Sequence, residues 1–194
     1  MSNGAEISLA DGESIDTVLN RLKPALFDPE FEALVTSKSP KDGSDILTAS
    51  VNNFYEGVTT KDLDGFEEQY ALNSRLVKNA DGKLEEQVYR AGFDNRVPPG
   101  LYAEQISEII EHLENAIPHA TPKMARALGA LIHYYRTGYA IDFREYNIAW
   151  VADTDSPVDT INGFIEVYVD ARGQKGSWEA VSYTHLTLPT TPYV

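Results

Sequence analysis

The sequence predicts an α+β fold, in which helical segments and a helical hairpin are followed by mixed β-strands. Two runs of apolar residues at helical spacing, over residues 102–117 and over residues 124–135, predict the helices. The strands are predicted because short runs rich in β-branched and aromatic residues lie between turn residues over 74–90 and 148–170. The chain has 194 residues, 42% of them hydrophobic, which suffices for one domain with a buried core.

The first predicted helix lies near the start of the chain. Ser14 is a suitable N-cap, because its side chain can accept a hydrogen bond from a backbone N–H of the first turn. Pro24 is expected to end the helix, since proline has no backbone N–H to donate. The apolar stripe of this helix comprises Ile15, Val18, Leu19 and Leu22. Its packing partner is not evident from the sequence.

A β-hairpin and a helical hairpin follow. Asp81-Gly82 predicts a turn between the strand-like runs "SRLVK" and "EEQVYR". Further on, Thr121 is expected to cap a second helix, with Pro122 at its first position and Gly138 as its left-handed stop. The stripe before the bend at Pro118 comprises Tyr102, Ile106, Ile109, Ile110, Leu113 and Ile117, and the stripe after it comprises Met124, Leu128, Leu131, Ile132 and Tyr135.

The carboxyl-terminal part is expected to be sheet. The runs "NIAWVAD" and "GFIEVYVD" are strand-like and are separated by the turn-rich "TDSPVDTIN". Gly173 and Gly176 are interpreted as turn glycines of a hairpin, because no strand-loop-helix context for a phosphate loop surrounds them.

The last 14 residues, "VSYTHLTLPTTPYV", differ in composition from the rest. They hold no Asp, Glu, Lys or Arg in a chain that is 24% charged, and nothing in them is expected to continue the sheet. We interpret residues 182–194 as a non-native tail, with a frayed, proline-containing terminus as the alternative. The expected organisation is a poorly defined N-terminus over residues 1–8, a domain over residues 9–181, and this tail.

Charge and composition exclude several classes of partner and site. Thirty acidic against sixteen basic side chains give a formal net charge of −14, which argues against nucleic acid and anionic membranes as partners. The chain contains no cysteine, so disulfides, thiolate nucleophiles and Cys-type zinc sites are excluded. There is no signal-peptide pattern and no membrane-length apolar run, so a cytoplasmic location is expected if Met1 is the true start.

No catalytic or metal-binding motif appears in the chain. Phosphate-loop, dinucleotide-binding and nucleophile-elbow patterns are missing, and the histidines have no metal-ligand spacing. We therefore expect no catalytic residue and no metal ligand here, and interpret the histidines as surface or core-edge side chains. They are His112, His119, His133 and His185.

The strand-like run "GFIEVYVD" holds the candidate site residues, Glu166 and Tyr168. Strand alternation is expected to place Glu166 and Tyr168 on one face, about 7 Å apart, where they could bind two ends of a small polar ligand. The pattern alone favours an ordinary solvated outer face instead. The expected core face comprises Ile165, Val167 and Val169, and the opposite face adds Phe164 and Asp170.

A resemblance to a known family favours a binding role for Glu166 and Tyr168 over a solvated outer face. From about Leu9 to Ala180 the chain resembles the dipeptidyl-peptidase III family of zinc metallopeptidases, in particular its shorter bacterial and plant-type members. The segments that carry the resemblance include "DILTASVNNFYEGVT", "FEEQYALNSRLVK", "GLYAEQISEIIEHLENAIPHA", "ALIHYYRTG" and "NIAWVADTDSPVDTINGFIEVYVDARGQKGSWEA". It implies two lobes flanking a wide cleft, with this chain forming most of the lobe that lacks zinc.

The resemblance also implies roles for the two candidates. In the family pattern "GFIE-x-Y", the glutamate holds the free α-amine of a bound peptide and the tyrosine contacts the peptide near the scissile bond. These positions are Glu166 and Tyr168, so Glu166 and Tyr168 are the expected substrate-binding residues and short peptides the expected partners.

The chain departs from the family in one respect. The zinc-binding His-Glu-x-x-Gly-His motif and the later Glu-Glu-x-Arg-Ala type segment are not in this sequence. We therefore expect an internal fragment of a zinc-dependent dipeptidyl-peptidase, inactive alone, whose zinc ligands and further partner surface lie in the missing lobe. The alternative is a stand-alone, non-catalytic peptide-binding or interaction module.

Overall fold

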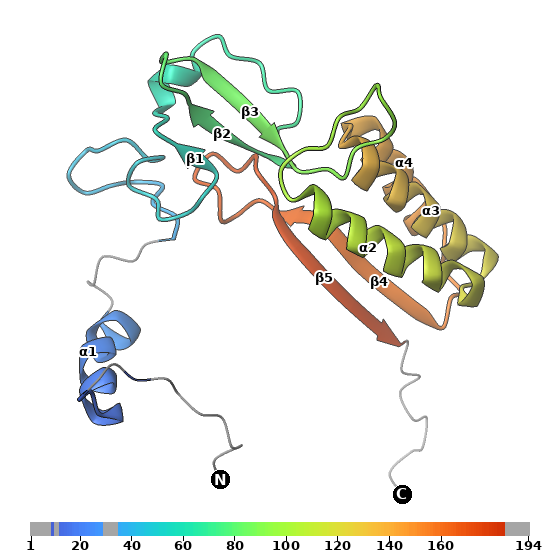
Figure 1. The fold of residues 1–194 in the computed structure, drawn as a ribbon, viewed down its shortest axis with the longest axis horizontal. Helices are drawn as coiled ribbons and strands as arrows, with labels where there is room; N and C mark the ends of the chain where they lie inside the picture. Colours follow the sequence, from blue (N-terminus) through green and yellow to red (C-terminus); the bar gives the residue numbers. More distant parts are fainter. Residues whose placement is uncertain (1–8, 10–11, 29–34, 185–194) are drawn as a thin grey trace, which may run out of the picture. The chain divides into compact units, whose positions relative to one another are not determined.

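The computed structural model describes residues 9, 12–28 and 35–184 (Figure 1). The chain divides into two compact units, Met1–Leu34 and Val35–Val194. Within the first unit, helix α1 spans Ile15–Phe27, and the Ser14 hydroxyl accepts a hydrogen bond from the Thr17 N–H at 3.1 Å, as predicted. Pro24 lies inside α1, so the predicted stop at this residue is wrong. The Pro24 carbonyl still accepts from the Asp28 N–H at 2.9 Å, which completes one more turn.

A three-stranded sheet opens the second unit. Strands β1 (Tyr55–Glu56), β2 (Ser74–Lys78) and β3 (Leu84–Val88) lie in that order, with β1 parallel and β3 antiparallel to β2. The predicted hairpin is confirmed, because β2 and β3 flank Asp81 and Gly82, and Gly82 has φ +75°. The Asn79 side chain accepts hydrogen bonds from the N–H groups of Asp81 and Lys83, which closes the turn. A short 3₁₀ helix, η1, spans Thr60–Leu63.

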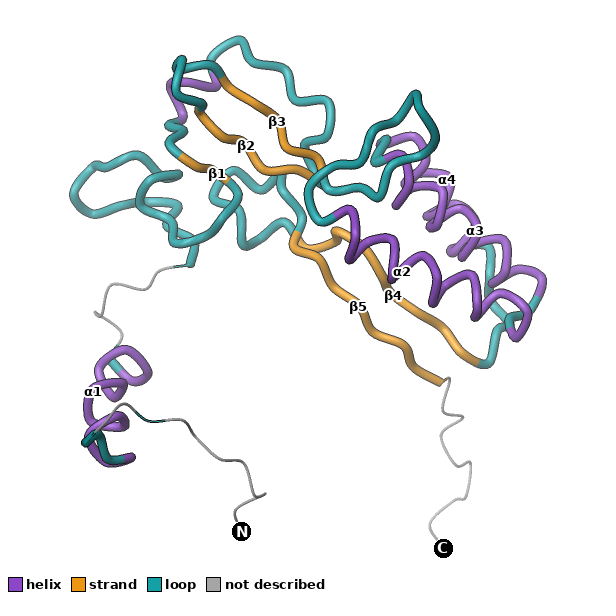
Figure 2. The backbone as a smooth tube through the Cα atoms, viewed as in Figure 1, coloured by secondary structure: helices purple, strands orange, loops and turns teal. Residues whose placement is uncertain are grey.

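The helical hairpin is also confirmed. Helix α2 spans Ala103–Ala116, the 3₁₀ helix η2 spans Ile117–His119, and α3 spans Pro122–Thr137. The Thr121 hydroxyl accepts from the Met124 N–H at 3.2 Å, and Gly138 ends α3 with φ +75°. Figure 2 shows α2 and α3 running antiparallel beside each other.

The run "NIAWVAD" forms a helix rather than the predicted strand. Helix α4 spans Ala140–Val151 and packs along α3. Its Phe143 ring lies 4.8 Å from that of Tyr134, and Tyr146 is 3% exposed. Phe143, Tyr146 and Trp150 recur at helical spacing, so burial of one helix face outweighs the strand preference of the isoleucine, tryptophan and valine in the run.

A two-stranded antiparallel sheet ends the described chain. Strand β4 spans Val158–Glu166 and β5 spans Ser177–Thr184. The first residues of β4 come from the run "TDSPVDTIN", where a turn was predicted. Residues 181–184 pair with residues 158–161, so the prediction that nothing in the last 14 residues continues the sheet is wrong for these four. Residues 185–194, and with them His185, lie outside the described residues.

Two clusters of buried side chains hold the second unit together. The larger, here called the helical core, joins α2, α3 and α4 to Tyr89 and to Phe164 of β4. The smaller, here called the small-sheet core, centres on Leu47, Val58 and Leu76. Most of the buried apolar side chains lie in the helical core. Strand β4 packs against α2, α3 and α4 through Phe164, which belongs to this core. No helix in the described ranges is long and apolar enough to cross a membrane.

Candidate functional site

Glu166 is the last residue of β4. The pairing of β4 with β5 is irregular between Phe164 and Glu166, so Ile165 is an extra residue and Glu166 pairs with Ser177. Glu166 is half-buried as a residue, and its carboxylate has no hydrogen-bond or ion-pair partner among the described residues. A carboxylate without a partner is ready to accept hydrogen bonds from a cationic ligand.

Tyr168 does not continue the strand, so the predicted two-face alternation over residues 164–170 is wrong. The segment after Glu166 is a turn in which the Asp170 N–H donates to the Val167 carbonyl at 3.2 Å. Phe164 is 6% exposed and lies in the helical core, whereas Tyr168 is 64% exposed. The predicted core residues Ile165, Val167 and Val169 are only half-buried. The extra residue at Ile165 changes the alternation, which a strict period of two cannot anticipate.

The turn that carries Tyr168 is tied to the loop before β1. The Val169 carbonyl accepts hydrogen bonds from the Thr36 hydroxyl at 2.5 Å and from the Asn52 amide at 3.3 Å. Both donors are more than 100 residues away along the sequence. These contacts fix the turn backbone while the Tyr168 ring stays exposed to solvent.

Asp170 closes the loop between β4 and β5. It is fully buried, and its carboxylate accepts from the backbone N–H groups of Arg172, Gln174 and Lys175 at 2.9–3.1 Å. The Tyr55 hydroxyl donates a fourth hydrogen bond at 3.0 Å. Burial and the neighbouring Asp170 charge raise the pKa of Tyr55 above its ordinary value.

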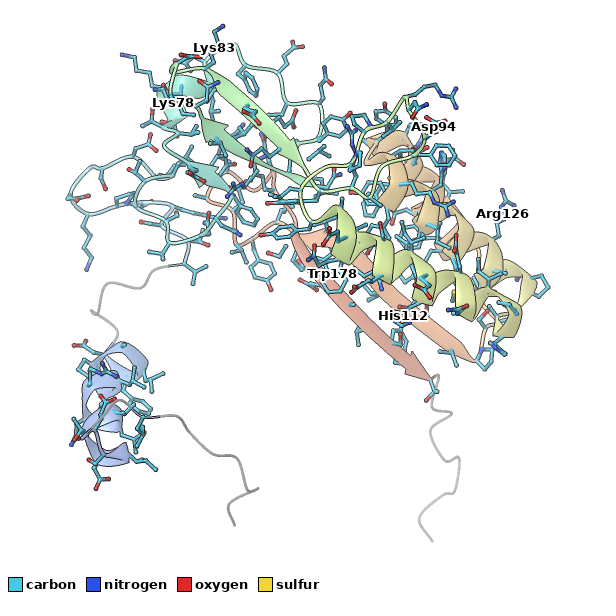
Figure 3. All side chains as sticks on the ribbon, viewed as in Figure 1. Lys78, Lys83, Asp94, His112, Arg126 and Trp178 are labelled. Atoms are coloured by element: carbon cyan, nitrogen blue, oxygen red, sulfur yellow. The ribbon has the colours of Figure 1, made fainter. Side chains whose placement is uncertain are left out.

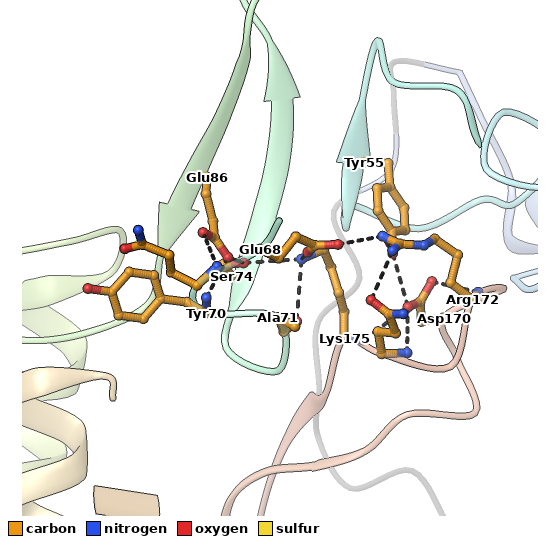
Figure 4. Close-up of polar contacts among 11 residues, drawn as sticks. Tyr55, Glu68, Tyr70, Ala71, Ser74, Glu86, Asp170, Arg172 and Lys175 are labelled. Atoms are coloured by element: carbon orange, nitrogen blue, oxygen red, sulfur yellow. Dashed lines mark hydrogen bonds and ion pairs between the residues drawn. The ribbon is translucent and has the colours of Figure 1, made fainter. Parts of the chain in front are cut away.

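A network of ion pairs attaches the same loop to Glu68, in the segment that precedes β2 (Figure 4). Lys175 is fully buried, and its ammonium group lies 2.6 Å from a Glu68 oxygen whose side chain is only 5% exposed. The other Glu68 oxygen lies 2.6 Å from the Arg172 guanidinium. Burial alone would lower the pKa of Arg172, but the pairing with Glu68 and the contact with Tyr55 raise it. Each charged side chain of this network is therefore paired with an opposite charge, and none is left available for catalysis.

Gly176 completes the loop through close packing. Its N–H donates to the Leu72 carbonyl at 2.8 Å. A Cβ atom at this position would lie 2.9 Å from the carbonyl carbon of Phe164 and 3.1 Å from its Cβ. The prediction of two turn glycines therefore holds for Gly173, with φ +68°, while Gly176 is required for the close approach of β5 to β4.

An apolar pocket of about 470 Å³ lies beside this loop, between the start of α2 and the start of β5. Figure 3 shows Trp178 at that end of β5, next to α2. The Trp178 indole donates to the Tyr135 hydroxyl at 3.1 Å, which orients the ring along the pocket wall. Val169 and Ser177 also line the pocket, whereas Glu166 and Tyr168 do not. The other lining residues are Asn52, Asn53, Phe54, Tyr89, Tyr102, Gln105, Ile106, Ile109, Phe164 and Gly176.

A second carboxylate lies close to Glu166 along the sheet. Glu179 is two residues beyond Ser177, the pairing partner of Glu166, and pairs with Gly163. Residues two apart on a strand share a face, so the register places Glu166 and Glu179 on the face opposite Phe164 and Trp178. Glu179 is half-buried and, within the described ranges, has no hydrogen-bond or ion-pair partner. Two carboxylates, those of Glu166 and Glu179, therefore lie on the same face near this end of the sheet.

The histidines do not gather into a site. His112 lies on α2 and is exposed, as Figure 3 shows, and His119 is exposed at η2. His133 is half exposed, 3.5 Å from an Asp142 oxygen and edge-on to the Phe93 ring. Over residues 9, 12–28 and 35–184, no group of three or more histidine, cysteine, aspartate or glutamate side chains could hold a metal ion.

Comparison with known proteins identifies the family. The family model for peptidase family M49 matches residues 14–184. The chain belongs to peptidase family M49. Its resemblance to dipeptidyl-peptidase III is thereby confirmed, and the M49 match covers the β4–β5 loop together with Glu166 and Tyr168. Family M49 implies a metal ion, for which the described residues offer no ligand group.

Relatives of M49 type match parts of the chain. Dipeptidyl peptidase 3 of Dictyostelium discoideum is 27% identical over 89 residues, which cover 45% of this chain and 13% of that protein. The solved dipeptidyl-peptidase III from Corallococcus sp. strain EGB has a TM-score of 0.53 at 21% identity, covering 68% of this chain and 24% of that one. DPP III from Caldithrix abyssi has a TM-score of 0.51 at 22% identity, covering 66% and 24%. The two structures support the α+β fold, and this chain spans a quarter or less of each relative.

The assignment of Glu166 and Tyr168 as substrate-binding residues stays a prediction, and the sequence did not indicate the buried ion pair in the loop that follows them. Glu68 and Lys175 are 107 positions apart, and no local pattern links the two. One signal was available: Asp170 precedes Gly173 by three residues, a spacing typical of turns that an aspartate side chain closes.

Proposed function

We propose that this chain is the substrate-binding portion of a metal-dependent dipeptidyl-peptidase that releases dipeptides from the N-termini of short peptides. The M49 match over residues 14–184 carries the proposal. The Glu166 carboxylate, which has no partner in the described part of the chain, and the exposed Tyr168 just after β4 support it. Because the chain spans 13% of its curated relative, the activity belongs to a complete protein that contains these residues.

Glu166 is the proposed partner of the peptide α-ammonium group. A carboxylate and an ammonium group form charge-assisted hydrogen bonds, which are stronger than neutral ones. The half-burial of Glu166 limits screening by water, and Glu179 on the same face adds negative potential. An acetylated N-terminus has no positive charge and should bind less well.

Tyr168 is the proposed contact for the peptide backbone. Its phenol can donate a hydrogen bond to a peptide carbonyl, and its exposure on a fixed turn leaves the hydroxyl accessible. Bound between Glu166 and Tyr168, a peptide would be held by its first residues. Anchoring of this kind would set a fixed distance from the N-terminus to the cleaved bond, as dipeptide release requires.

The metal is proposed to be zinc, bound outside the described residues. The described residues do not fit a metal ion, so no chemical step is assigned to this chain. We propose that the complete protein supplies the His-Glu-x-x-Gly-His motif that the resemblance implies. A cytoplasmic location stays an expectation.

The test uses the complete coding sequence that contains these residues. The proposal expects a His-Glu-x-x-Gly-His motif beyond residue 184, and release of dipeptides from a free tetrapeptide but not from its acetylated form. Glu166→Gln should lower kcat/KM by about 10- to 100-fold, because a charge-assisted hydrogen bond is lost. Lys123→Met is the matched control, since it removes a charge from an exposed ion pair with Asp155.

Two outcomes would contradict the proposal. A complete protein that ends without the metal motif but binds peptides would favour the stand-alone peptide-binding module. Equal cleavage of free and acetylated peptides, or an unchanged kcat/KM in Glu166→Gln, would remove Glu166 from substrate binding.

A further inference from the structure

We infer that Lys175, held by Glu68, is a positioning residue that sets the geometry of Glu166 for binding a peptide amine. The inference rests on the proposed function and extends it to a buried ion pair outside the peptide site. Lys175 has no exposed surface and cannot touch a peptide itself. Its effect must therefore pass through the loop that joins Glu166 to β5.

The ammonium group of Lys175 is buried inside the protein. Placing an ammonium group in a site with no exposed surface is costly unless the charge is paired and hydrogen-bonded. Glu68 supplies the opposite charge at 2.6 Å. The Ala71 carbonyl at 3.3 Å and the Ser74 hydroxyl at 3.1 Å complete the shell of the ammonium group. The hydrogen-bond partners of the ammonium group thus all lie in the segment from Glu68 to Ser74, and the group also lies 5.7 Å from the centroid of the Tyr55 ring.

That segment is itself fixed to the three-stranded sheet. Glu86 of β3 accepts from the N–H groups of Gln69 and Tyr70 at 2.9 and 2.7 Å, and from the Ser74 hydroxyl at 3.1 Å. The segment that binds Lys175 is therefore fixed by Glu86 of β3 and continues directly into β2 at Ser74 (Figure 4). A fixed anchor can transmit a defined position to the chain attached to it.

Only one residue separates Lys175 from the partner of Glu166. Gly176 donates to the Leu72 carbonyl at 2.8 Å, and Ser177 then pairs with Glu166. On the other side of the loop, Asp170 binds the Lys175 N–H at 2.9 Å and so closes the loop near the end of β4. The Glu68–Lys175 pair thus fixes the position of both ends of the loop, and with them the position of Glu166.

A purely structural role and a positioning role differ in what they affect. A structural pair affects stability alone, whereas a positioning pair affects how well Glu166 distinguishes a charged from an uncharged N-terminus. The discriminating quantity is the ratio of affinities for tetra-alanine with a free amine and N-acetyl-tetra-alanine. Calorimetry on the full 194-residue chain measures this ratio, and amide hydrogen exchange reports the order of residues 170–177.

The ratio of affinities for the free and the acetylated peptide is expected to differ among the variants. The wild-type chain prefers the free amine by about tenfold or more, and Glu166→Gln brings the ratio close to one. Lys175→Met also lowers the ratio, by about three- to tenfold, and speeds exchange of the backbone amides at positions 172, 174 and 175, which bind Asp170. Lys123→Met, which removes an exposed paired lysine, changes neither quantity. If Lys175→Met fails to fold, the double variant Glu68→Gln/Lys175→Met removes both buried charges and is measured in its place.

The outcomes separate the two claims. A folded Lys175→Met or double variant that keeps the wild-type ratio, while Glu166→Gln loses it, overturns the positioning role and leaves the proposed function standing. A wild-type ratio of one overturns the peptide-amine role of Glu166, and the positioning role with it, even if amide exchange shows an ordered loop.

Discussion

Gly176 lies directly before β5, and its backbone packs closely against Phe164 of β4. Gly176→Ala should lower the free energy of unfolding by about 1–3 kcal/mol, because its Cβ would overlap the Phe164 backbone. Gly129→Ala is the matched control, since a Cβ at Gly129 in α3 meets nothing within 4 Å. The control should raise stability by about 0.5–1 kcal/mol through helix propensity. Urea unfolding measures both, and a neutral Gly176→Ala would contradict the close packing of this loop.

Glu166 and Tyr168, the proposed peptide-binding residues, lie where the sequence pattern and the structure differ. Glu166 and Tyr168 were identified from the family pattern, but their geometry was wrong because Ile165 is an extra residue in β4. Whether a strand carries a bulge depends on the partner strand and on contacts such as Thr36 with Val169, which are distant in sequence. Buried pairs such as Glu68 with Lys175 are equally invisible to local patterns.

Elements with strong local signals were predicted well. The Thr121 cap, Pro122 at the first position and the Gly138 stop identify α3 without tertiary information. The Asp81-Gly82 turn does the same for the β2–β3 hairpin. By contrast, α4 was mistaken for a strand because short apolar runs fit both periods, and its packing against Tyr134 of α3 decides between them.

The whole second unit depends on buried tyrosines, which makes it sensitive to alkaline pH. Burial raises the pKa of Tyr89 and of Tyr146 to about 12, with added effects from Tyr102 and Asp159. Burial also raises the pKa values of Tyr55, Tyr134 and Tyr135. Because an unfolded tyrosine ionises near pH 10, the stability from these groups is fully present below about pH 10 and is lost as pH rises to 12 and beyond.

The alkaline prediction is tested by unfolding in urea at a series of pH values. The free energy of unfolding should fall between about pH 10 and 12, together with phenolate absorbance that appears in step with loss of the native circular dichroism. Titration of all 11 tyrosines near pH 10 with the native spectrum retained would contradict the burial of these side chains.

For the whole molecule, we propose that the end of β4 is the place where a peptide N-terminus binds. The most direct test is a structure of the chain with bound tetra-alanine. We expect the α-ammonium group of the peptide to lie within about 2.7–2.9 Å of a Glu166 carboxylate oxygen. A peptide bound elsewhere, for example in the apolar pocket lined by Trp178 with its amine free in solvent, would contradict it.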